Sequence, residues 1–418
     1  MGTVEIPWGA WYETKPRRLS FPDRFELFVP PVPVGPDLGA EEIRKALESP
    51  VGSPTLAELA ARTQSGVAVA VDDLTRPTPA GRFLPWVLDT VEEAGIGPED
   101  IVVVVATGAH RSLQRSDLLK KLGPEVVGRV AVFNHSPYDG LVEYGATRRG
   151  TPITINRWFA EAGLKITLGS VLPHPTAGFG GGAKIVLPGL GSLEALKCNH
   201  GPAVKEAAGP VGQIEGNVLR ADVEEAAAKV GVDFSINVVC PAVGVVAAVV
   251  AGHPVESHRA ACAEARRLFT VPAPPGPVDI ACLNAYPKDT EFLQVANAFN
   301  VWADRDKPLV APGGTVVVLT AASEGFGTHG LLGPGGPLYR PLAERAGFAR
   351  LFEGRAVAVV CPTITRRELD LIFPPSTALF ADWPACRSFL EERHPASARV
   401  AIFAASALQI VETPRGES

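Results

Sequence analysis

The sequence has no run of lysine and arginine, and this absence argues against a nucleic-acid partner. Across 418 residues, 39 basic side chains face 45 acidic ones, so the formal net charge is −6. A phosphate backbone is bound by clustered positive charge, which is missing here. Because 46% of the residues are hydrophobic and only 20% are charged, the composition predicts a globular protein rather than a disordered one.

Long apolar segments are also missing. No stretch approaches the roughly 18 apolar residues that a membrane span requires. The residues after Met1 show neither the basic nor the apolar region of a signal peptide. The longest apolar run, residues 242–251, is short and predicts a buried strand. We therefore expect a cytoplasmic protein with no membrane partner.

The cysteines do not form a CxxC motif or a regular framework. Scattered cysteines are typical of a reduced, cytoplasmic chain and not of a disulfide scaffold or a structural zinc site. The six positions are Cys198, Cys240, Cys262, Cys282, Cys361 and Cys386.

Short β-branched runs alternate with amphipathic segments, which predicts parallel α/β architecture. Ser112 is expected to cap one of the intervening helices. A proline-rich segment at residues 271–277 cannot continue a helix or a central strand, so it predicts a linker. The expected strands are residues 67–71, 101–106, 165–171 and 234–239 before the linker, and 278–284, 315–321, 356–362 and 400–406 after it.

This pattern predicts two doubly wound, Rossmann-like domains with the active site in the cleft between them. Residues 1–272 would form the N-terminal domain and residues 278–406 the C-terminal domain. Residues 407–418 would form a tail that packs back on the N-terminal domain.

Polar segments directly follow the expected strands. In open α/β sheets, ligands bind beyond the carboxyl ends of the strands, so these segments are candidates for a common site. They contain Asp72, Asp73, Thr75 and Arg76 after the first strand, Thr107, His110 and Arg111 after the second, and His174 and Lys184 after the third.

A glycine cluster precedes Lys184. Gly178, Gly180, Gly181 and Gly182 match neither a Walker loop nor the GxGxxG dinucleotide fingerprint. One interpretation is a surface loop with a solvated lysine. The other is a loop whose backbone approaches a ligand, next to a desolvated and nucleophilic Lys184.

Three of the eight histidines stand in strand-end or glycine-rich contexts, namely His110, His174 and His200. Imidazole suits proton transfer at neutral pH or metal binding. The remaining histidines are interpreted as structural. They are His135, His253, His258, His329 and His394.

Several motifs together resemble the lactate racemase family of nickel-pincer enzymes. The longest and most specific is HPTAGFGGGAKIVLPG, at residues 174–189. The others occur in the same order as in the family and are DLTRP at 73–77, ATGAHR at 106–111, NHG at 199–201 and YPKD at 286–289, followed by Gln294.

The resemblance implies a nickel-pincer nucleotide, pyridinium-3,5-bisthiocarboxylic acid mononucleotide nickel, which Lys184 would hold covalently. It implies His200 as the protein ligand of the nickel, and His110 and His174 as paired acid/base residues. Arg76 would bind substrate oxygens. The residues expected to contact the cofactor are Lys184, Asp73, Thr75, Gly180, Gly181, Gly182, Tyr286 and Gln294.

The implied reaction inverts a carbinol carbon by removing a hydride and returning it to the other face. Such a C–H bond is too weak an acid for a histidine, so hydride removal with deprotonation of the hydroxyl avoids a carbanion. Two bases are needed because the hydroxyl points in opposite directions in the two isomers. Separate biosynthetic proteins would have to supply the cofactor.

The chain departs from the lactate-acting members of the family at two positions. Where they carry a tyrosine and a lysine, this chain has Leu293 and Asn297. A lost lysine removes a charge-assisted bond to a carboxylate. We therefore expect a longer hydroxy acid, a sugar acid or a polyol in place of lactate, bound by Arg76, Gln294 and Asn297.

Two other functions fit part of the pattern. The glycine cluster and strand-end histidines also occur in two-domain nicotinamide-dependent dehydrogenases, although no GxGxxG follows the first strand. A non-catalytic carbohydrate- or nucleotide-binding protein could use the same cleft. Nicotinamide reduction in nickel-free protein would indicate the first, and tight binding without turnover the second.

Overall fold

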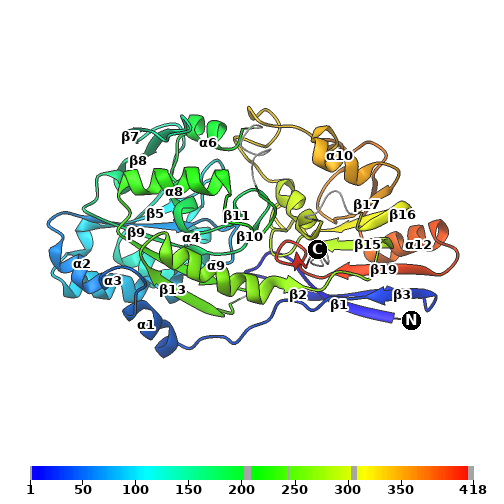
Figure 1. Ribbon diagram of the computed structural model, residues 1–418, viewed down its shortest axis with the longest axis horizontal. Coiled ribbons are helices and arrows are strands. Elements are labelled where there is room, and N and C mark those ends of the chain that lie inside the picture. Colours follow the sequence, from blue (N-terminus) through cyan, green and yellow to red (C-terminus); the bar gives the residue numbers. More distant parts are fainter. Residues whose placement is uncertain (1, 202–208, 243, 303–307, 413–418) are drawn as a thin grey trace. The chain divides into compact units, whose positions relative to one another are not determined.

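The computed structural model describes residues 2–201, 209–242, 244–302 and 308–412. The chain divides into two compact units (Figure 1). We call residues 34–268 the central unit and residues 1–33 with 269–418 the terminal unit. Each unit is built around a six-stranded sheet.

The sheet of the central unit has the strand order β13-β12-β9-β4-β5-β6. Counted along the chain, this is the 3-2-1-4-5-6 order of the Rossmann fold, whose order reverses between β4 and β9. Only the pairing of β13 with β12 is antiparallel among these strands. The strands are β4 Val67–Asp72, β5 Ile101–Ala106, β6 Ala131–Asn134, β9 Leu164–Ser170, β12 Phe234–Val239 and β13 Ala248–Gly252.

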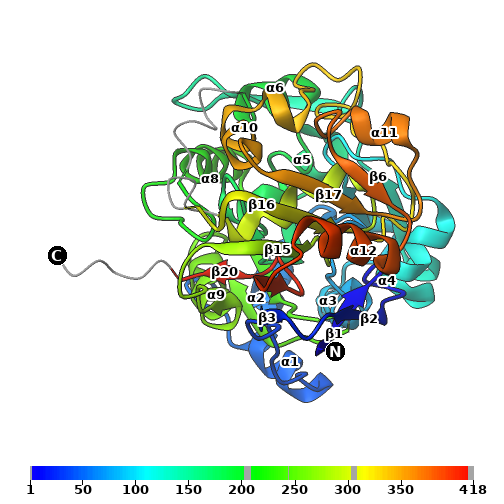
Figure 2. The ribbon, with the colours of Figure 1, turned by 90° about the vertical axis from the view of Figure 1, so that its right-hand side faces the viewer.

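Helices cover both faces of this sheet, and this explains why every residue of β4 and β12 is buried. The chain moves one way from β4 to β6 and the other way from β9 to β12, so right-handed crossovers place α3 and α4 opposite α8 (Figures 1 and 2). Helix α9 follows β13 and pairs with α8 through Arg259 and Glu224. The helices are α1 Ala40–Glu48, α2 Leu56–Arg62, α3 Leu84–Glu93, α4 Arg115–Arg129, α5 Arg157–Ala160, α6 Leu193–Asn199, α8 Val218–Val230 and α9 Glu256–Phe269.

Smaller elements of the central unit lie mostly in its loops. The hairpin β7–β8 sits between β6 and β9, and the short pair β10–β11 follows β9. The bounds are η1 Ala80–Arg82, η2 Pro98–Asp100, β7 Leu141–Ala146, β8 Pro152–Asn156, β10 Pro173–His174, β11 Gly178–Phe179 and η3 Gly182–Ile185.

Two local predictions are corrected. Helix α4 is capped by Gln114 and not by Ser112, because the Asp117 carboxylate accepts the Gln114 N–H at 3.0 Å. Of the apolar run 242–251, only the part from Ala248 is strand, since the chain first turns after β12 to bring β13 antiparallel to it.

The sheet of the terminal unit has the order β18-β17-β16-β15-β19-β3, and all its pairings are parallel. Its order reverses between β15 and β19. The strands are β3 Phe25–Phe28, β15 Val278–Asn284, β16 Val310–Leu319, β17 Ala356–Val360, β18 Ala378–Phe380 and β19 Ala398–Phe403. Two small sheets accompany it, β1 Gly2–Trp8 with β2 Lys15–Phe21 and β14 Thr270–Val271 with β20 Ile410–Val411.

Separate apolar cores lie on the two faces of this sheet. One contains residues of η4, α10 and α11, including Phe299 and Phe352. The other joins α12 to the β1–β2 hairpin through Phe21 and Trp383, whose rings meet edge to face at 4.9 Å. The helices are η4 Phe292–Val301, η5 Leu342–Glu344, α10 Ala346–Phe352, α11 Arg366–Asp370 and α12 Trp383–Arg393.

The division between the units differs from the predicted domains at both ends of the chain. Residues 1–33 group with the C-terminal part because β3 pairs with β19 as an edge strand. The tail pairs with β14 through β20, while residues 413–418 lie outside the described residues. A second proline-rich segment at residues 30–36 marks the change of unit that the sequence analysis missed.

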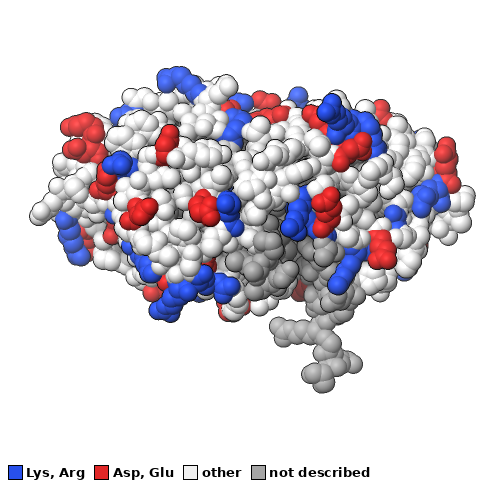
Figure 3. Space-filling model, turned by 90° about the horizontal axis from the view of Figure 1, so that it is seen from above, with Lys and Arg blue, Asp and Glu red and all other residues white. Residues whose placement is uncertain are grey.

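In the described part of the chain, no helix has the length and hydropathy to cross a membrane. On the face drawn in Figure 3, basic and acidic residues are intermingled, and basic residues do not gather into a single patch.

Candidate active site

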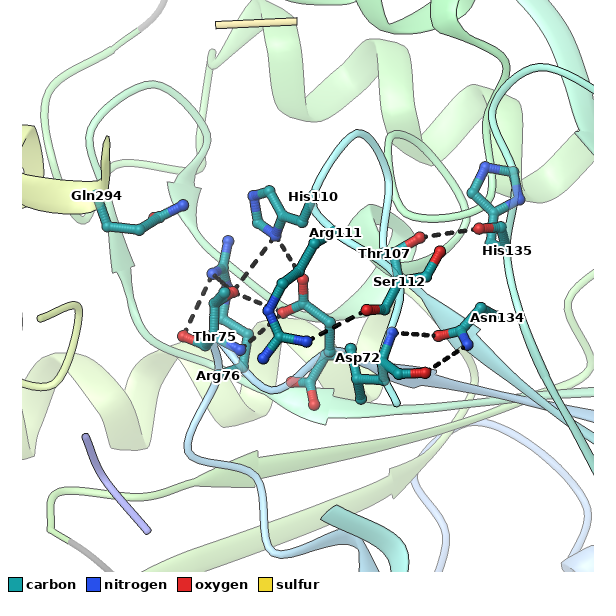
Figure 4. Close-up of polar contacts among 12 residues, drawn as sticks. Asp72, Thr75, Arg76, Thr107, His110, Arg111, Ser112, Asn134, His135 and Gln294 are labelled. Atoms are coloured by element: carbon teal, nitrogen blue, oxygen red, sulfur yellow. Dashed lines mark hydrogen bonds and ion pairs between the residues drawn. The ribbon is translucent and has the colours of Figure 1, made fainter. Parts of the chain in front are cut away.

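Most predicted site residues of the central unit follow β4, β5 and β9. Strands β4 and β9 flank the reversal point, and β5 lies beside β4. His110 lies in the turn after β5 (Figure 4). It hydrogen bonds through Nδ1 to the carboxylate of Asp73, which follows β4. Burial opposes the charged carboxylate, but His110, Arg76 and Thr75 outweigh it and hold the pKa of Asp73 well below its usual range. With Nδ1–H donated to Asp73, the Nε2 atom of neutral His110 carries the lone pair that can accept a proton.

Thr75 connects this pair to Arg76. The Thr75 hydroxyl donates to Asp73 Oδ1 at 2.5 Å and accepts from Arg76 Nη1 at 2.6 Å. The Thr75 N–H also donates to Asp73 Oδ1, at 3.0 Å. The structure thus brings four predicted residues into one hydrogen-bonded chain, Arg76–Thr75–Asp73–His110.

The neighbouring Asp72 is not part of this hydrogen-bonded chain and connects the ends of two strands. Its Oδ2 accepts from Thr78 Oγ1 at 2.5 Å and from the Ser170 N–H at 2.9 Å, so it ties the end of β4 to the end of β9. Its Oδ1 lies 2.6 Å from Lys121 Nζ, and the Lys121 side chain is completely buried. Lys121 also donates to the Arg76 carbonyl at 2.9 Å, and this fixes the backbone beside Arg76.

His174 and Lys184 face each other, with Nε2 of the histidine 2.8 Å from Nζ of the lysine. The other ring nitrogen, Nδ1, accepts backbone N–H groups from Thr176 at 3.2 Å and Ala177 at 3.1 Å. An Nδ1 that accepts carries no proton, so a neutral ring has its proton on Nε2. His174 therefore donates to Lys184, which requires the lysine to be an uncharged amine.

The electrostatics of Lys184 agree with this assignment. Burial lowers the pKa of Lys184 well below its usual range, and the nearby charges of Arg220 and Arg76 lower it further. An uncharged amine is a nucleophile, whereas an ammonium is not. The interpretation of Lys184 as a desolvated, reactive lysine fits this geometry better than that of a solvated surface lysine.

The glycines before Lys184 are required by packing within the central unit. Gly178, Gly181 and Gly182 all have positive φ. A Cβ at Gly182 would lie 2.6 Å from the His258 ring, and one at Gly178 would lie 2.0 Å from the Gln213 carbonyl. His258 donates Nε2–H to the Gly180 carbonyl at 2.8 Å, and burial lowers the pKa of His258 well below its usual range. What Gly180, Gly181 and Gly182 do toward a cofactor stays a prediction.

A hydrogen bond connects the turn that carries His110 to the segment after Lys184. The Gly108 N–H donates to the Gly189 carbonyl at 2.9 Å, and the Gly189 N–H donates to the Lys184 carbonyl at 3.1 Å. Gly108 has a φ of 56°, which favours glycine at this turn. The loops after β5 and β9 are therefore joined by backbone hydrogen bonds.

His200 caps the C-terminus of α6, where its N–H donates to the Leu196 carbonyl at 2.9 Å. The residue before it, Asn199, is fully buried and donates to Asp222 of α8 at 2.7 Å. Asp222 also accepts from Thr147 and Thr151. Among the described residues no group of three or more His, Cys, Asp or Glu side chains could hold a metal ion. The role of His200 as a single nickel ligand stays a prediction.

The remaining predicted residues belong to the terminal unit. Tyr286 is buried and its hydroxyl accepts from Thr14 Oγ1 at 3.5 Å. Asn297 and Gln294 both lie in η4, where the Asn297 amide donates to the Gln294 carbonyl at 2.8 Å. These contacts lie within the unit, and the ligand-binding roles of the three residues stay predictions.

Sequence reasoning missed Lys121 and Arg220, two buried cations beneath the site. Both occur in helical segments, where a single basic residue is usually solvated. Each is recognised only by its partners from other elements, Asp72 for Lys121 and the loop carbonyls for Arg220. His135 and His258, which were interpreted as structural, are buried and bonded to backbone carbonyls.

Comparisons with known proteins identify relatives of this chain. Residues 12–210 match the lactate racemase N-terminal domain. The chain is 30% identical over 294 residues to the lactate racemase of Lactiplantibacillus plantarum, a match that covers 69% of this chain and 68% of that protein. It is 28% identical over 291 residues to the lactate racemase of Thermoanaerobacterium thermosaccharolyticum, covering 69% of this chain and 67% of that protein.

Solved structures share the fold. The lactate racemase apoprotein from T. thermosaccharolyticum superposes with a TM-score of 0.80 at 22% identity, covering 99% of this chain and all of that one (100%). A Thermotoga maritima protein has a TM-score of 0.63 at 16% identity, covering 92% and 100%.

These relatives define an isomerase of the racemase and epimerase class. More specifically, the chain belongs to the lactate racemase family. This membership favours the isomerase over both the nicotinamide-dependent dehydrogenase and the non-catalytic binding protein.

Proposed function

We propose that this chain inverts a carbinol carbon by hydride transfer to a nickel-pincer nucleotide attached to Lys184. The observation that carries the proposal is the contact between Lys184 Nζ and His174 Nε2, at 2.8 Å. It supports an uncharged, nucleophilic amine beside a histidine that can exchange protons.

The residues present fit such a cofactor. Lys184 offers an amine for covalent attachment, and His200 offers an imidazole, a suitable ligand for nickel in a nitrogen and sulfur environment. When bound, the cofactor supplies the group that takes the hydride from the carbinol carbon and gives it back. The cofactor would come from separate biosynthetic proteins.

His110 is suited to accept the hydroxyl proton of one substrate isomer at Nε2. Asp73 holds Nδ1–H of the ring and would keep an imidazolium paired. This carboxylate–histidine arrangement fixes the tautomer and orientation of a general base.

His174 would serve the opposite isomer through Nε2. In the loaded enzyme it would be the imidazolium when it supplies the proton and the neutral imidazole when it takes one, so that no imidazolate forms. After the substrate has become a planar carbonyl compound, the proton returns from one histidine or the other, depending on the face to which the hydride returns. Arg76, held by Thr75, would bind the substrate's oxygen atoms. Asp73 and Thr75 thus support both the base and the binding group.

The substrate is proposed to be a hydroxy acid, a sugar acid or a polyol other than lactate. Leu293 and Asn297 support this choice, because neither provides the positive charge that a small carboxylate would favour. A cytoplasmic location stays a prediction from composition.

Intact-mass and nickel analysis of protein produced with the cofactor-building enzymes tests the attachment. We expect one modified pyridinium mononucleotide with stoichiometric nickel in the wild type, and neither in Lys184→Ala. Lys197→Ala, which removes a surface lysine paired with Glu194 on α6, should load like the wild type. Absence of the adduct, under conditions that load a known lactate racemase, would refute the proposal.

Loaded protein would then be screened for racemisation of hydroxy acids, sugar acids and polyols by chiral chromatography. Inversion of one of these compounds with lactate a poor substrate is the expected result. Efficient racemisation of lactate would overturn the substrate assignment and leave the attachment intact.

A further inference from the structure

A buried arginine lies beneath the loop that carries His174 and Lys184. Arg220 of α8 is 1% exposed, and its guanidinium donates to the carbonyls of Phe179, Ala177 and Gly181, the last two at 3.4 Å. In the described part of the chain it forms no ion pair with a carboxylate, and its Nε has no hydrogen-bond partner. A fully buried guanidinium partnered by carbonyls keeps its positive charge.

The carbonyls that Arg220 binds belong to residues that orient the two reactive side chains. Ala177 also donates its N–H to Nδ1 of His174, at 3.1 Å. The Gly181 carbonyl also accepts the N–H of Lys184, at 3.3 Å. Arg220 therefore contacts both the residue that sets the His174 tautomer and the turn from which Lys184 projects.

The start of α8 adds a second anchor to this loop. Asn217, the N-cap residue, donates its side-chain amide to the Thr176 carbonyl at 2.9 Å. Arg220 lies three residues later, almost one helical turn along, so both side chains reach the loop from the first turn of α8. The loop is thus held by a helix that is rigidly packed in the core.

The charge of Arg220 has an effect of its own. Burial is the largest cause of the low pKa of Lys184, and the guanidinium of Arg220 is the next. A second cation close to Arg220 would be repelled in an interior of low dielectric constant.

We propose that Arg220 is a positioning residue for cofactor attachment, which fixes the loop 177–181 and keeps Lys184 an uncharged amine facing His174. This inference rests on the proposed function only in taking Lys184 as the attachment residue. The state of the amine itself is a property of the cofactor-free chain.

Competitive acetylation of cofactor-free protein across pH tests the proposal. Acetic anhydride in trace amounts labels uncharged amines, and mass spectrometry of the peptides gives the labelling midpoint of each lysine. The exposed Lys45 serves as the internal reference. The variants are Arg220→Met, which removes charge and bonds, and Arg220→Lys, which retains the charge. Arg259→Met is the matched control, because Arg259 is a partly exposed arginine of α9 paired with Glu224.

In the wild type we expect Lys184 to titrate well below Lys45. In Arg220→Met its midpoint should rise by about one unit, so the labelling curve of Lys184 should shift by about one pH unit toward that of Lys45. Arg220→Lys should keep the low midpoint but lower the melting temperature, and Arg259→Met should change neither. A purely structural role would leave the midpoint unmoved in all folded variants.

Equal Lys184 midpoints in the wild type and a folded Arg220→Met variant would overturn the proposal. If Arg220→Met does not fold, a Lys184 midpoint in Arg220→Lys that rises to that of Lys45 would overturn it as well. Failure of the proposed function has a different signature, since an unloaded wild type would show no adduct while its Lys184 midpoint stayed low.

Discussion

The two sheets each place a buried aspartate just beyond the strand at which their order reverses, and the two carboxylates are held in opposite states. Asp73 follows β4 in the central unit, and Asp289 follows β15 in the terminal unit. Their exposed fractions are 3% and 0%. Depth of burial therefore does not distinguish them.

The partners make the difference. Asp73 is contacted by His110 and Thr75 and lies near Arg76, and these groups lower its pKa in spite of burial. At Asp289 burial dominates and raises the pKa to about 7, although the Gly9 N–H donates to Oδ2 at 3.2 Å. Cationic and hydrogen-donating partners thus keep the Asp73 carboxylate charged. The corresponding position in the terminal unit holds a carboxyl that is largely uncharged below neutral pH and binds the turn after β1.

Replacement of Asp73 by asparagine should have the largest effect, a loss of catalytic rate. An amide can still bond to the His110 ring but cannot stabilise an imidazolium, so we expect Asp73→Asn to lower kcat about 10²–10⁴-fold. The check is the racemisation rate of the loaded enzyme, with the Lys184 adduct verified by mass. Asp289→Asn is the matched control and should leave kcat nearly unchanged. A kcat for Asp73→Asn near that of the wild type would show that His110 needs no carboxylate.

The Asp73 carboxylate should also make the unfolding free energy depend on pH. Because the pKa of Asp73 is lowered on folding, its stabilising contribution is present above the unfolded value of about 4 and is lost as pH falls below it. The difference in unfolding free energy between the wild type and Asp73→Asn should therefore shrink below about pH 4.

Asp72, the residue before Asp73, is expected to affect stability through its ion pair with Lys121. Asp72→Asn leaves the buried ammonium of Lys121 without its carboxylate, so we expect a loss of about 3–5 kcal/mol in unfolding free energy. Denaturant unfolding measures it. In the double variant Asp72→Asn/Lys121→Met much of this loss should be recovered, because no buried charge is left unpaired. An unchanged unfolding free energy in Asp72→Asn would show that the Asp72–Lys121 ion pair does not stabilise the fold.

Asp289 provides the reverse pH dependence. An acid whose pKa rises on folding to about 7 destabilises the fold as pH increases from the unfolded value toward 7. Asp289→Asn removes this penalty, so we expect a gain on the order of 1–4 kcal/mol at pH 8 that disappears near pH 4. Unfolding curves at both pH values measure the gain. An equal gain in unfolding free energy at pH 8 and pH 4 would show that Asp289 does not titrate between these pH values.

The smallest expected effect concerns substrate choice in the terminal unit. Asn297 now bonds to the Gln294 carbonyl, and Asn297→Lys would restore a positive charge there. We expect kcat/KM for lactate to rise about tenfold, in keeping with one added charge-assisted hydrogen bond. Asn297→Met introduces an uncharged side chain about as long as lysine, so it should not raise kcat/KM for lactate. An equal kcat/KM for lactate in both variants would remove Asn297 from the substrate assignment.

The strands and their polar ends could be predicted from the sequence because each is a local pattern. Runs such as residues 67–71 and 101–106 are buried on both faces, so their apolar residues are continuous and visible in the sequence. The polar residues directly after them converge because parallel strands end at one edge. His110 and Asp73 meet for this reason.

Features that depend on distant partners could not be predicted in this way. Nothing local shows that residues 25–28 add to a sheet formed more than 250 residues later, or that Lys121 pairs with Asp72. The same holds for Arg220, whose carbonyl partners lie 39 to 43 residues earlier in the chain. Helix starts are equally context-dependent, as the cap at Gln114 shows.

If Lys184 carries the cofactor as proposed, the hydrogen bond from His174 to Lys184 would exist only before the cofactor is attached. The bond uses the lone pair of an amine nitrogen, 2.8 Å from the ring. Acylation of that nitrogen delocalises the lone pair into the new carbonyl or thiocarbonyl group, so the lysine can no longer accept the proton of the histidine. His174 is thus occupied in the cofactor-free chain, and the proposed attachment at Lys184 would free its ring for the proposed proton transfer.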